Sequence, residues 1–129
     1  MTTYALRYTE RVQREISLTA AWIIDRMQEE GATDDEIAAR VLAWNAGLKS
    51  EIAALSTFPG AHQRIQVSRR PALFFRRLLY RHGKGSIGHH VYYDVEEESP
   101  DGPRVRILHL RPANLPLPPA EARALVSSP

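Results

Sequence analysis

The stretch FFRRLLYRHGKGSIGHHVYYDV, residues 74–95, decides how the second half of this chain folds. Its first part, Phe74–Arg81, is rich in aromatic and branched residues and predicts a basic strand. Its last part, His89–Val95, predicts a second strand in which Tyr93 faces the core and His90 faces the opposite side. The glycine-rich segment between the two parts indicates a short link, so we expect an antiparallel pair.

Two further strands are predicted around this pair. Val105–Leu110 (VRILHL) follows a turn rich in proline and glycine and predicts the last strand of a three-stranded antiparallel meander. Tyr4–Tyr8 (YALRY) predicts a short strand near the start of the chain. Residues 64–67 (RIQV) also alternate between polar and apolar, but we expect only three consecutive strands in this half.

The first half of the chain has the spacing of two amphipathic helices. The first helix is expected to begin after Thr9, and Gly31 ends it in the position that favours a left-handed cap. The second is expected to begin after Thr33, where Glu36 completes a capping box. The two apolar stripes are Val12, Ile16, Ala20, Ile23 and Met27, and then Ile37, Val41, Trp44, Leu48, Ile52 and Leu55. The short loop between the helices predicts an antiparallel helical hairpin.

The expected architecture is an α+β fold in the order strand, helix, helix, strand, strand, strand. An N-terminal strand precedes an antiparallel helical hairpin that packs on a small antiparallel sheet. A chain of 129 residues is the size of one domain, which we assign to residues 1–113. Residues 114–129 form a proline-rich C-terminal tail, in which residues 120–126 can form one short helix.

The composition excludes several classes of protein. The chain contains no cysteine, which rules out disulfide scaffolds, zinc ribbons and thiol nucleophiles. No apolar run approaches the roughly 18 residues of a membrane span, and the first residues lack the apolar region of a secretory signal. The expected location is therefore the cytoplasm, without a membrane partner. No metal or cofactor is expected, because the adjacent His89 and His90 face opposite sides of a strand and no histidine pair has the helical spacing of metal ligands.

Charge is distributed unevenly along the chain. The net charge is +2, and fifteen of the 17 basic residues are arginines. Residues 58–91 contain seven basic residues and no acidic one, whereas residues 92–103 contain five acidic residues and no basic one. Such a basic block is typical of a protein that binds a polyanion or an acidic partner, and arginine suits bidentate contacts with phosphate. The alternative is that the basic block is an ordinary solvent-exposed face whose arginines reflect a coding bias toward arginine.

Four short phrases carry a resemblance to a known family. They are LSTFPG at 55–60, FRRLLY at 75–80, HVYYDV at 90–95 and VRILHLR at 105–111. Together with the N-terminal strand and the helical hairpin, they resemble the RelE/ParE superfamily of bacterial type II toxin–antitoxin toxins, from about Tyr4 to Ala113. The resemblance implies a small toxin that an antitoxin protein neutralises. One branch of the family cleaves messenger RNA in the ribosomal A site without a metal, and the ParE-like branch poisons DNA gyrase.

The resemblance also implies where the functional residues lie. The positions that match the family pattern are Arg77 and Arg81 at the first basic strand, Tyr93 in the next strand and Arg111 at the end of the last strand. In metal-free cleavage, arginines would stabilise the charge that develops on the phosphate. His90 is the best candidate for the acid or base, because the ordinary pKa of histidine is near neutrality. The catalytic residues that we expect are therefore Arg77, Arg81, His90 and Arg111.

Residues that bind RNA or a partner are expected on the same strands: Arg76, Tyr92, Arg106 and His109. Tyr92 could stack on a base, and His109 is a second candidate acid or base. Arg76 and Arg77 point to opposite faces of a strand, so only one of them can line a given groove, and the family pattern favours Arg77. In the alternative interpretation, His90 and Tyr92 line a solvated sheet face and His109 is a core or edge histidine.

The preferred function is the toxin of a type II toxin–antitoxin system, acting as a metal-independent, ribosome-dependent mRNA endoribonuclease. Two alternatives stay open: a non-enzymatic, ParE-like inhibitor of DNA gyrase, and an inactive toxin-like protein that binds only RNA or an antitoxin. The gyrase alternative is favoured by the long helical hairpin and by Pro112 and Asn114, which stand where the nuclease branch commonly has histidine and arginine. The expected partners are a cognate antitoxin and either the ribosome with its mRNA or DNA gyrase.

Overall fold

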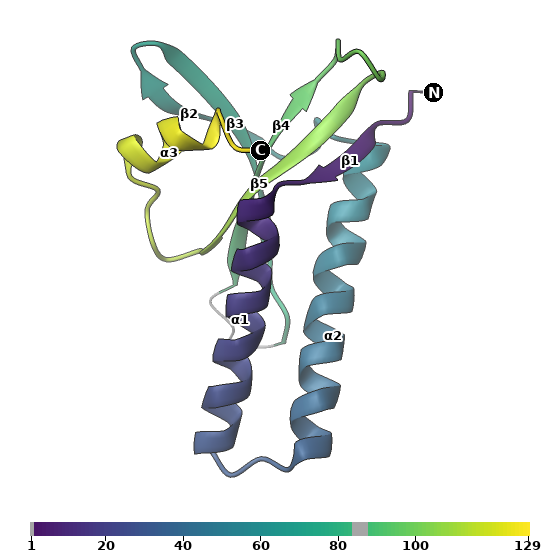
Figure 1. Ribbon diagram of the computed structural model, residues 1–129, viewed down its shortest axis with the longest axis vertical. Helices are drawn as coiled ribbons and strands as arrows, with labels where there is room; N and C mark the ends of the chain where they lie inside the picture. The colour runs from purple at the N-terminus through teal and green to yellow at the C-terminus, as the bar shows by residue number, and fades with distance from the viewer. Residues whose placement is uncertain (1, 84–87) are drawn as a thin grey trace.

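The computed structural model describes residues 2–83 and 88–129, and these form an α+β fold (Figure 1). The predicted link at residues 84–87 lies outside the described residues. In chain order the elements are β1 (Ala5–Tyr8), α1 (Glu10–Glu29), α2 (Asp34–Ala53), the single-turn 3₁₀ helix η1 (Ala54–Ser56), β2 (Gln63–Arg69), β3 (Ala72–Tyr80), β4 (His89–Glu96), β5 (Arg104–Pro112) and α3 (Pro119–Leu125).

The sheet differs from the prediction in two ways. Its order is β1-β5-β4-β3-β2, and β1 runs parallel to β5, so the sheet is mixed rather than antiparallel. The segment from Gln63 to Arg69 is a strand of its own, which pairs antiparallel with β3. The alternation at residues 64–67 was therefore a true strand signal, and four consecutive strands, not three, follow the helical hairpin.

The helical hairpin forms where the sequence predicts it. The Thr9 hydroxyl accepts a hydrogen bond from the Val12 amide at 3.3 Å and so caps α1. Thr33 and Glu36 form the reciprocal capping box of α2. Figure 1 shows that both helices extend well below the sheet, so that their connecting turn lies far from the strands.

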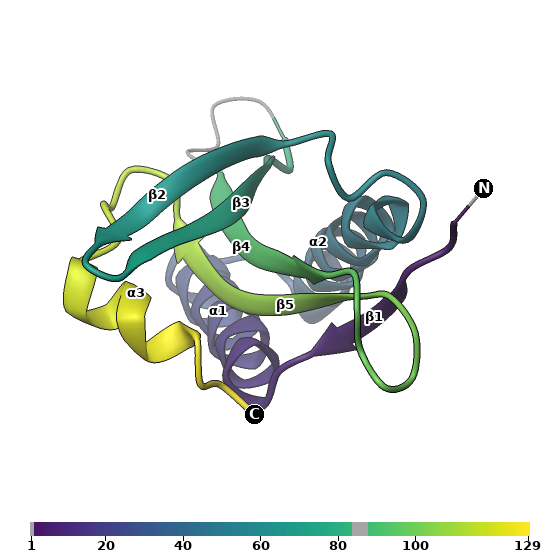
Figure 2. The same ribbon diagram turned by 90° about the horizontal axis from the view of Figure 1, so that it is seen from above.

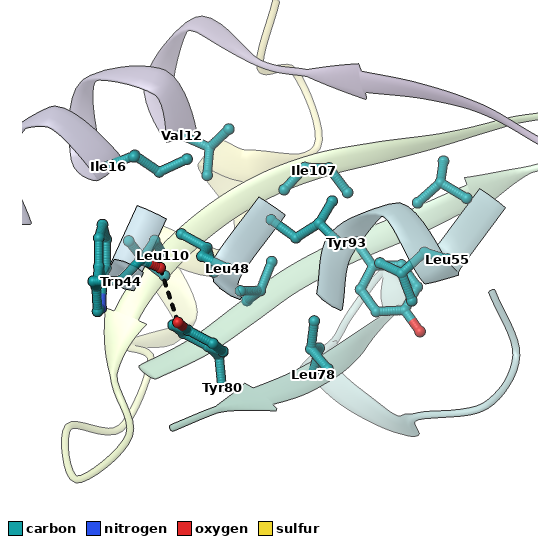
Figure 3. Close-up of a cluster of buried hydrophobic side chains, with 13 residues drawn as sticks. Val12, Ile16, Trp44, Leu48, Leu55, Leu78, Tyr80, Tyr93, Ile107 and Leu110 are labelled. Carbon is teal, nitrogen blue, oxygen red and sulfur yellow. Dashed lines mark hydrogen bonds between the residues drawn. The ribbon is translucent and has the colours of Figure 1, made fainter. Parts of the chain in front are cut away.

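One face of the sheet and the helical hairpin enclose the main core (Figure 3). Tyr93 is fully buried there, as predicted, together with Leu48 of α2 and Val91 of β4. Two tyrosines anchor the strands to the helical layer: Tyr80 donates to the Trp44 carbonyl at 2.8 Å, and Tyr93 donates to the Pro59 carbonyl at 2.6 Å. Burial raises the pKa of Tyr93 to about 12, so this phenol keeps its proton and its hydrogen bond at neutral pH.

The opposite face of the sheet is partly covered by α3. Leu125 is fully buried against Phe75 and Leu108 in a second, smaller apolar cluster. Figure 2 shows α3 beside the tip of the β2–β3 hairpin and away from α2. The proline-rich segment 114–129 thus contains the expected short helix, and this helix packs on the sheet.

None of the helices among the described residues combines the length and the apolar character needed to cross a membrane.

Candidate functional site

The pairing of β3, β4 and β5 collects most of the predicted site residues on the sheet face opposite the helical hairpin. Arg77 pairs with Tyr92, which pairs with His109 on the next strand. In the adjacent row, His90 lies between Leu79 and Arg111. Directly opposed residues in antiparallel strands project from the same face, so these two rows form one continuous surface, which we call the β3–β5 face.

Arg77 and His90 occupy the accessible part of the β3–β5 face. Nη2 of Arg77 donates to Oε1 of Gln63 at 3.1 Å, which orients the guanidinium without neutralising its charge. His90 is half-buried, and partial burial together with the charge of Arg77 lowers its pKa below the ordinary 6.5. Its imidazole is therefore neutral at pH 7 and free to accept a proton.

Tyr92 and His109 occupy the covered part of the same face. Both are almost completely buried, and their ring centroids lie 5.8 Å apart. Tyr92 also meets His90 edge to face at 6.1 Å. Both Tyr92 and His109 therefore act as packing residues here, and neither is presented to a ligand, because α3 and the neighbouring strands cover this half of the face.

Arg111 is held by an acidic residue that sequence analysis did not single out. Its Nη1 donates to Oε2 of Glu121 in α3 at 3.2 Å, and Arg11 of α1 binds the other oxygen of the same carboxylate. On the other side of His109, Glu15 lies 2.6 Å from Nδ1 and accepts from the Leu110 amide at 3.1 Å. His109 thus sits between two carboxylates, although neither of its ring nitrogens makes a hydrogen bond of good geometry among the described residues.

One sequence signal pointed toward Glu121. It is the only acidic residue between positions 104 and 129, and it stands in a segment otherwise rich in proline and alanine. The sequence alone does not show the role of Glu121. The ion pair with Arg111 joins two different elements and exists only because α3 packs on β5.

Arg106 lies at the other end of the sheet, where neighbouring carboxylates balance its charge. It forms two hydrogen bonds with Asp94, one of them 3.0 Å from Nε to Oδ1, and approaches Glu96 at 2.9 Å. The Asp94 hydrogen bonds raise the pKa of Arg106, so it stays charged. The neighbouring Arg104 binds Glu96 at 2.7 Å. These ion pairs give part of the acidic run after residue 92 a structural role, because its carboxylates balance the arginines of β5.

The remaining two arginines lie outside the cluster formed by Arg77 and His90. Arg76 points to the opposite face from Arg77, as predicted, and its Nη1 donates to the His62 carbonyl at 2.8 Å. Arg81 follows the end of β3 and is exposed. Of the four residues expected to be catalytic, Arg77 and His90 are diagonal neighbours on β3 and β4, where the charge of Arg77 helps to lower the His90 pKa, and Arg111 lies beside His90 in the next strand.

Within residues 2–83 and 88–129, no group of three or more histidine, aspartate or glutamate side chains is arranged to hold a metal ion. The residues present on the β3–β5 face, a neutral imidazole beside arginines, can accept a proton and stabilise negative charge.

The contact between Arg77 and His90 makes a testable prediction about titration. Replacing Arg77 by alanine is expected to raise the pKa of His90, because a neighbouring positive charge that disfavours the imidazolium is removed. The pKa would be measured by NMR titration of the histidine ring protons, with Arg14→Ala, an exposed arginine of α1, as the control. An unchanged or lowered His90 pKa in the Arg77 variant would show that the two groups do not interact.

In comparisons with known proteins, no family model matched this chain, and neither a curated protein nor a solved structure gave a significant match.

Proposed function

We propose that this protein is the toxin of a type II toxin–antitoxin system and cleaves messenger RNA on the ribosome without a metal ion. The observation that carries the proposal is the placement of Arg77 beside a neutral, half-buried His90 on an uncovered part of the sheet. The basic charge of β2 and β3 also supports it. Among the described residues no carboxylate pairs with an arginine of these two strands, so their charge is available to phosphate.

The proposed reaction uses the 2′-hydroxyl of the RNA as nucleophile. His90 accepts the proton of this hydroxyl, and the oxygen attacks the adjacent phosphorus. Arg77 stabilises the extra negative charge on the phosphate oxygens, and Arg81 adds positive potential from the neighbouring strand end. Arg111 contributes less to this potential, because Glu121 balances its charge. The bond to the 5′ oxygen then breaks, leaving a 2′,3′-cyclic phosphate. Solvent water protonates the departing oxygen, because His109 is buried and cannot reach it.

A cognate antitoxin is part of this proposal. An acidic segment of such a partner would neutralise the same unpaired arginines that bind RNA, and so block the site by competition. Arg77 and Arg81 are the residues that it would cover, since Arg106 already has carboxylate partners.

A second candidate function, inhibition of DNA gyrase, is favoured by the helical hairpin. Leu18 and Trp22 on α1 and Leu42 on α2 are large apolar side chains that are exposed to solvent. Exposed apolar residues on a projecting element are typical of protein–protein contact surfaces. If the protein neither cleaves RNA nor inhibits gyrase, it is the inactive toxin-like protein that binds RNA or an antitoxin.

Translation in a purified ribosomal system, followed by primer extension on the message, tests the proposal. We expect cuts within codons in the ribosomal A site. The matched control is the same system without the protein. Intact message would contradict the nuclease proposal, and a supercoiling assay with purified DNA gyrase would then test the second candidate.

A further inference from the structure

A second basic surface lies on the other face of the β2–β3 hairpin, away from Arg77 and His90. Arg64 of β2 pairs with Arg76 of β3, and the guanidinium carbon of Arg64 lies 4.0 Å from the ring centroid of Phe74. Phe74 is 41% exposed, although it belongs to a strand of the central sheet. Figure 1 shows why: the β2–β3 hairpin projects at the end of the molecule opposite the turn between α1 and α2, so the helices do not cover it.

This surface continues into a cavity of about 540 Å³. Arg76 lines the cavity, and its guanidinium is bound by the carbonyl of His62, so it keeps its charge. Phe58, which is 62% exposed, forms part of the wall. Across the cavity, Glu97 accepts a hydrogen bond from the Tyr4 hydroxyl at 2.8 Å. Cavities of this size suit a small planar group that is held by apolar walls and a few polar atoms.

We infer that single-stranded RNA crosses this face, with one base stacked on the Arg64–Phe74 pair and a neighbouring base in the cavity beside Arg76 and Phe58. The inference rests on the proposed function for its choice of RNA as the ligand. It adds a binding surface for the message on the opposite face of the β2–β3 hairpin from the proposed cleavage site.

The chemistry of the surface favours RNA over an acidic peptide. An acidic peptide needs positive charge alone, whereas this surface also presents exposed planar groups: two phenyl rings and a guanidinium whose central carbon lies 4.0 Å from the centre of one of them. Bases stack on aromatic rings and on guanidinium planes, and this stacking does not depend on base identity. The carboxylate of Glu97 can accept hydrogen bonds from the amino groups of a base, whereas the ionised side chains of an acidic peptide have no donor to offer it.

Conservative variants separate stacking from charge. Arg64→Lys keeps the positive charge but loses the planar group, and Phe74→Leu keeps an apolar side chain but loses the ring. Trp22 and Arg26 on α1 form another exposed pair, with the guanidinium carbon 5.2 Å from the ring, and they provide the matched control variants Arg26→Lys and Trp22→Leu. Circular dichroism and thermal melting would verify that each variant folds as the original protein does.

The experiment measures the binding of a fluorescein-labelled, 2′-O-methylated RNA 12-mer by fluorescence anisotropy, because this RNA lacks the nucleophile and cannot be cleaved. We expect Arg64→Lys and Phe74→Leu each to weaken binding about five- to tenfold, as expected for the loss of one stacked base. The Trp22 and Arg26 variants should bind with unchanged affinity. Equal affinity of all variants would overturn the inference, as would an absence of binding by the original protein.

A poly-glutamate peptide of similar charge serves as the competing ligand. If the original protein prefers this peptide to the RNA, the surface belongs to an acidic protein partner and the inference is overturned. The experiments distinguish a failure of the stacking surface from a failure of the proposed nuclease function. RNA binding that depends on Phe74 in a protein that cuts no message would refute only the nuclease proposal. Cleavage with no effect of Arg64→Lys or Phe74→Leu on binding would refute only the stacking surface.

Discussion

Replacing both Arg77 and His90 by alanine is expected to lower ribosome-dependent RNA cleavage by about a thousandfold or more. In the proposed reaction His90 supplies the proton acceptor, and such a group typically contributes about 10²- to 10⁴-fold to a rate. Arg77 stabilises the negative charge of the transition state, and removing one such group typically costs about 10²- to 10³-fold. The two effects need not multiply, because burial and the charge of Arg77 together lower the pKa of His90, so removing Arg77 also changes the proton acceptor. Primer extension on a translated message measures the rate of cutting.

The control for this double variant is Arg14→Ala, which removes an exposed arginine of α1 far from the sheet face. It should cut at the original rate. Arg77→Lys is informative as a third variant, since it keeps the charge but loses the planar fork, and it should cut at an intermediate rate. Full cleavage by the variant that lacks both Arg77 and His90 would mean that the reaction takes place elsewhere on the molecule.

Gly47→Ala is expected to destabilise the protein by about 2 kcal/mol, although alanine normally stabilises a helix interior by about 1 kcal/mol relative to glycine. A Cβ at position 47 would lie only 2.3 Å from the hydroxyl oxygen of Tyr80. Tyr80 cannot move away freely, because its ring is buried and its hydroxyl donates to the Trp44 carbonyl. The free energy of unfolding, measured by chemical denaturation, should therefore fall.

Tyr80→Phe provides the matched partner for this test. Alone, it loses one hydrogen bond, which costs about 1 kcal/mol. Combined with Gly47→Ala, it removes the oxygen that the new methyl group would meet, so the double variant should be more stable than Gly47→Ala alone. If Gly47→Ala were as stable as the original protein, the helix α2 and the strand β3 would have to lie further apart than the structure has them.

Local patterns in the sequence were sufficient to predict the helical layer and the core-facing side of the sheet. Two of these patterns are the apolar stripe that includes Val12 and Ile16 and the capping box at Thr33. Each depends on residues within four positions of one another, so it can be recognised in the sequence without knowing the fold. The same holds for the alternation in β4, which correctly placed Val91 and Tyr93 in the core. Local spacing also separated Arg76 from Arg77 onto opposite faces.

Sequence periodicity by itself thus determined the two long helices, most of the strands, and the core-facing side of the helices and of β4, although β2 was not counted as a strand. Only the tertiary structure decided that β1 runs parallel to β5, which brings Ala5 beside Arg104 across nearly the whole chain. It also decided which arginines keep a free charge: Arg106 meets Asp94 and Arg111 meets Glu121, whereas within the described part of the chain Arg77 meets no carboxylate. The physical reason is that an ion pair depends on distances of a few ångströms between distant parts of the chain. Neither composition nor periodicity carries that information.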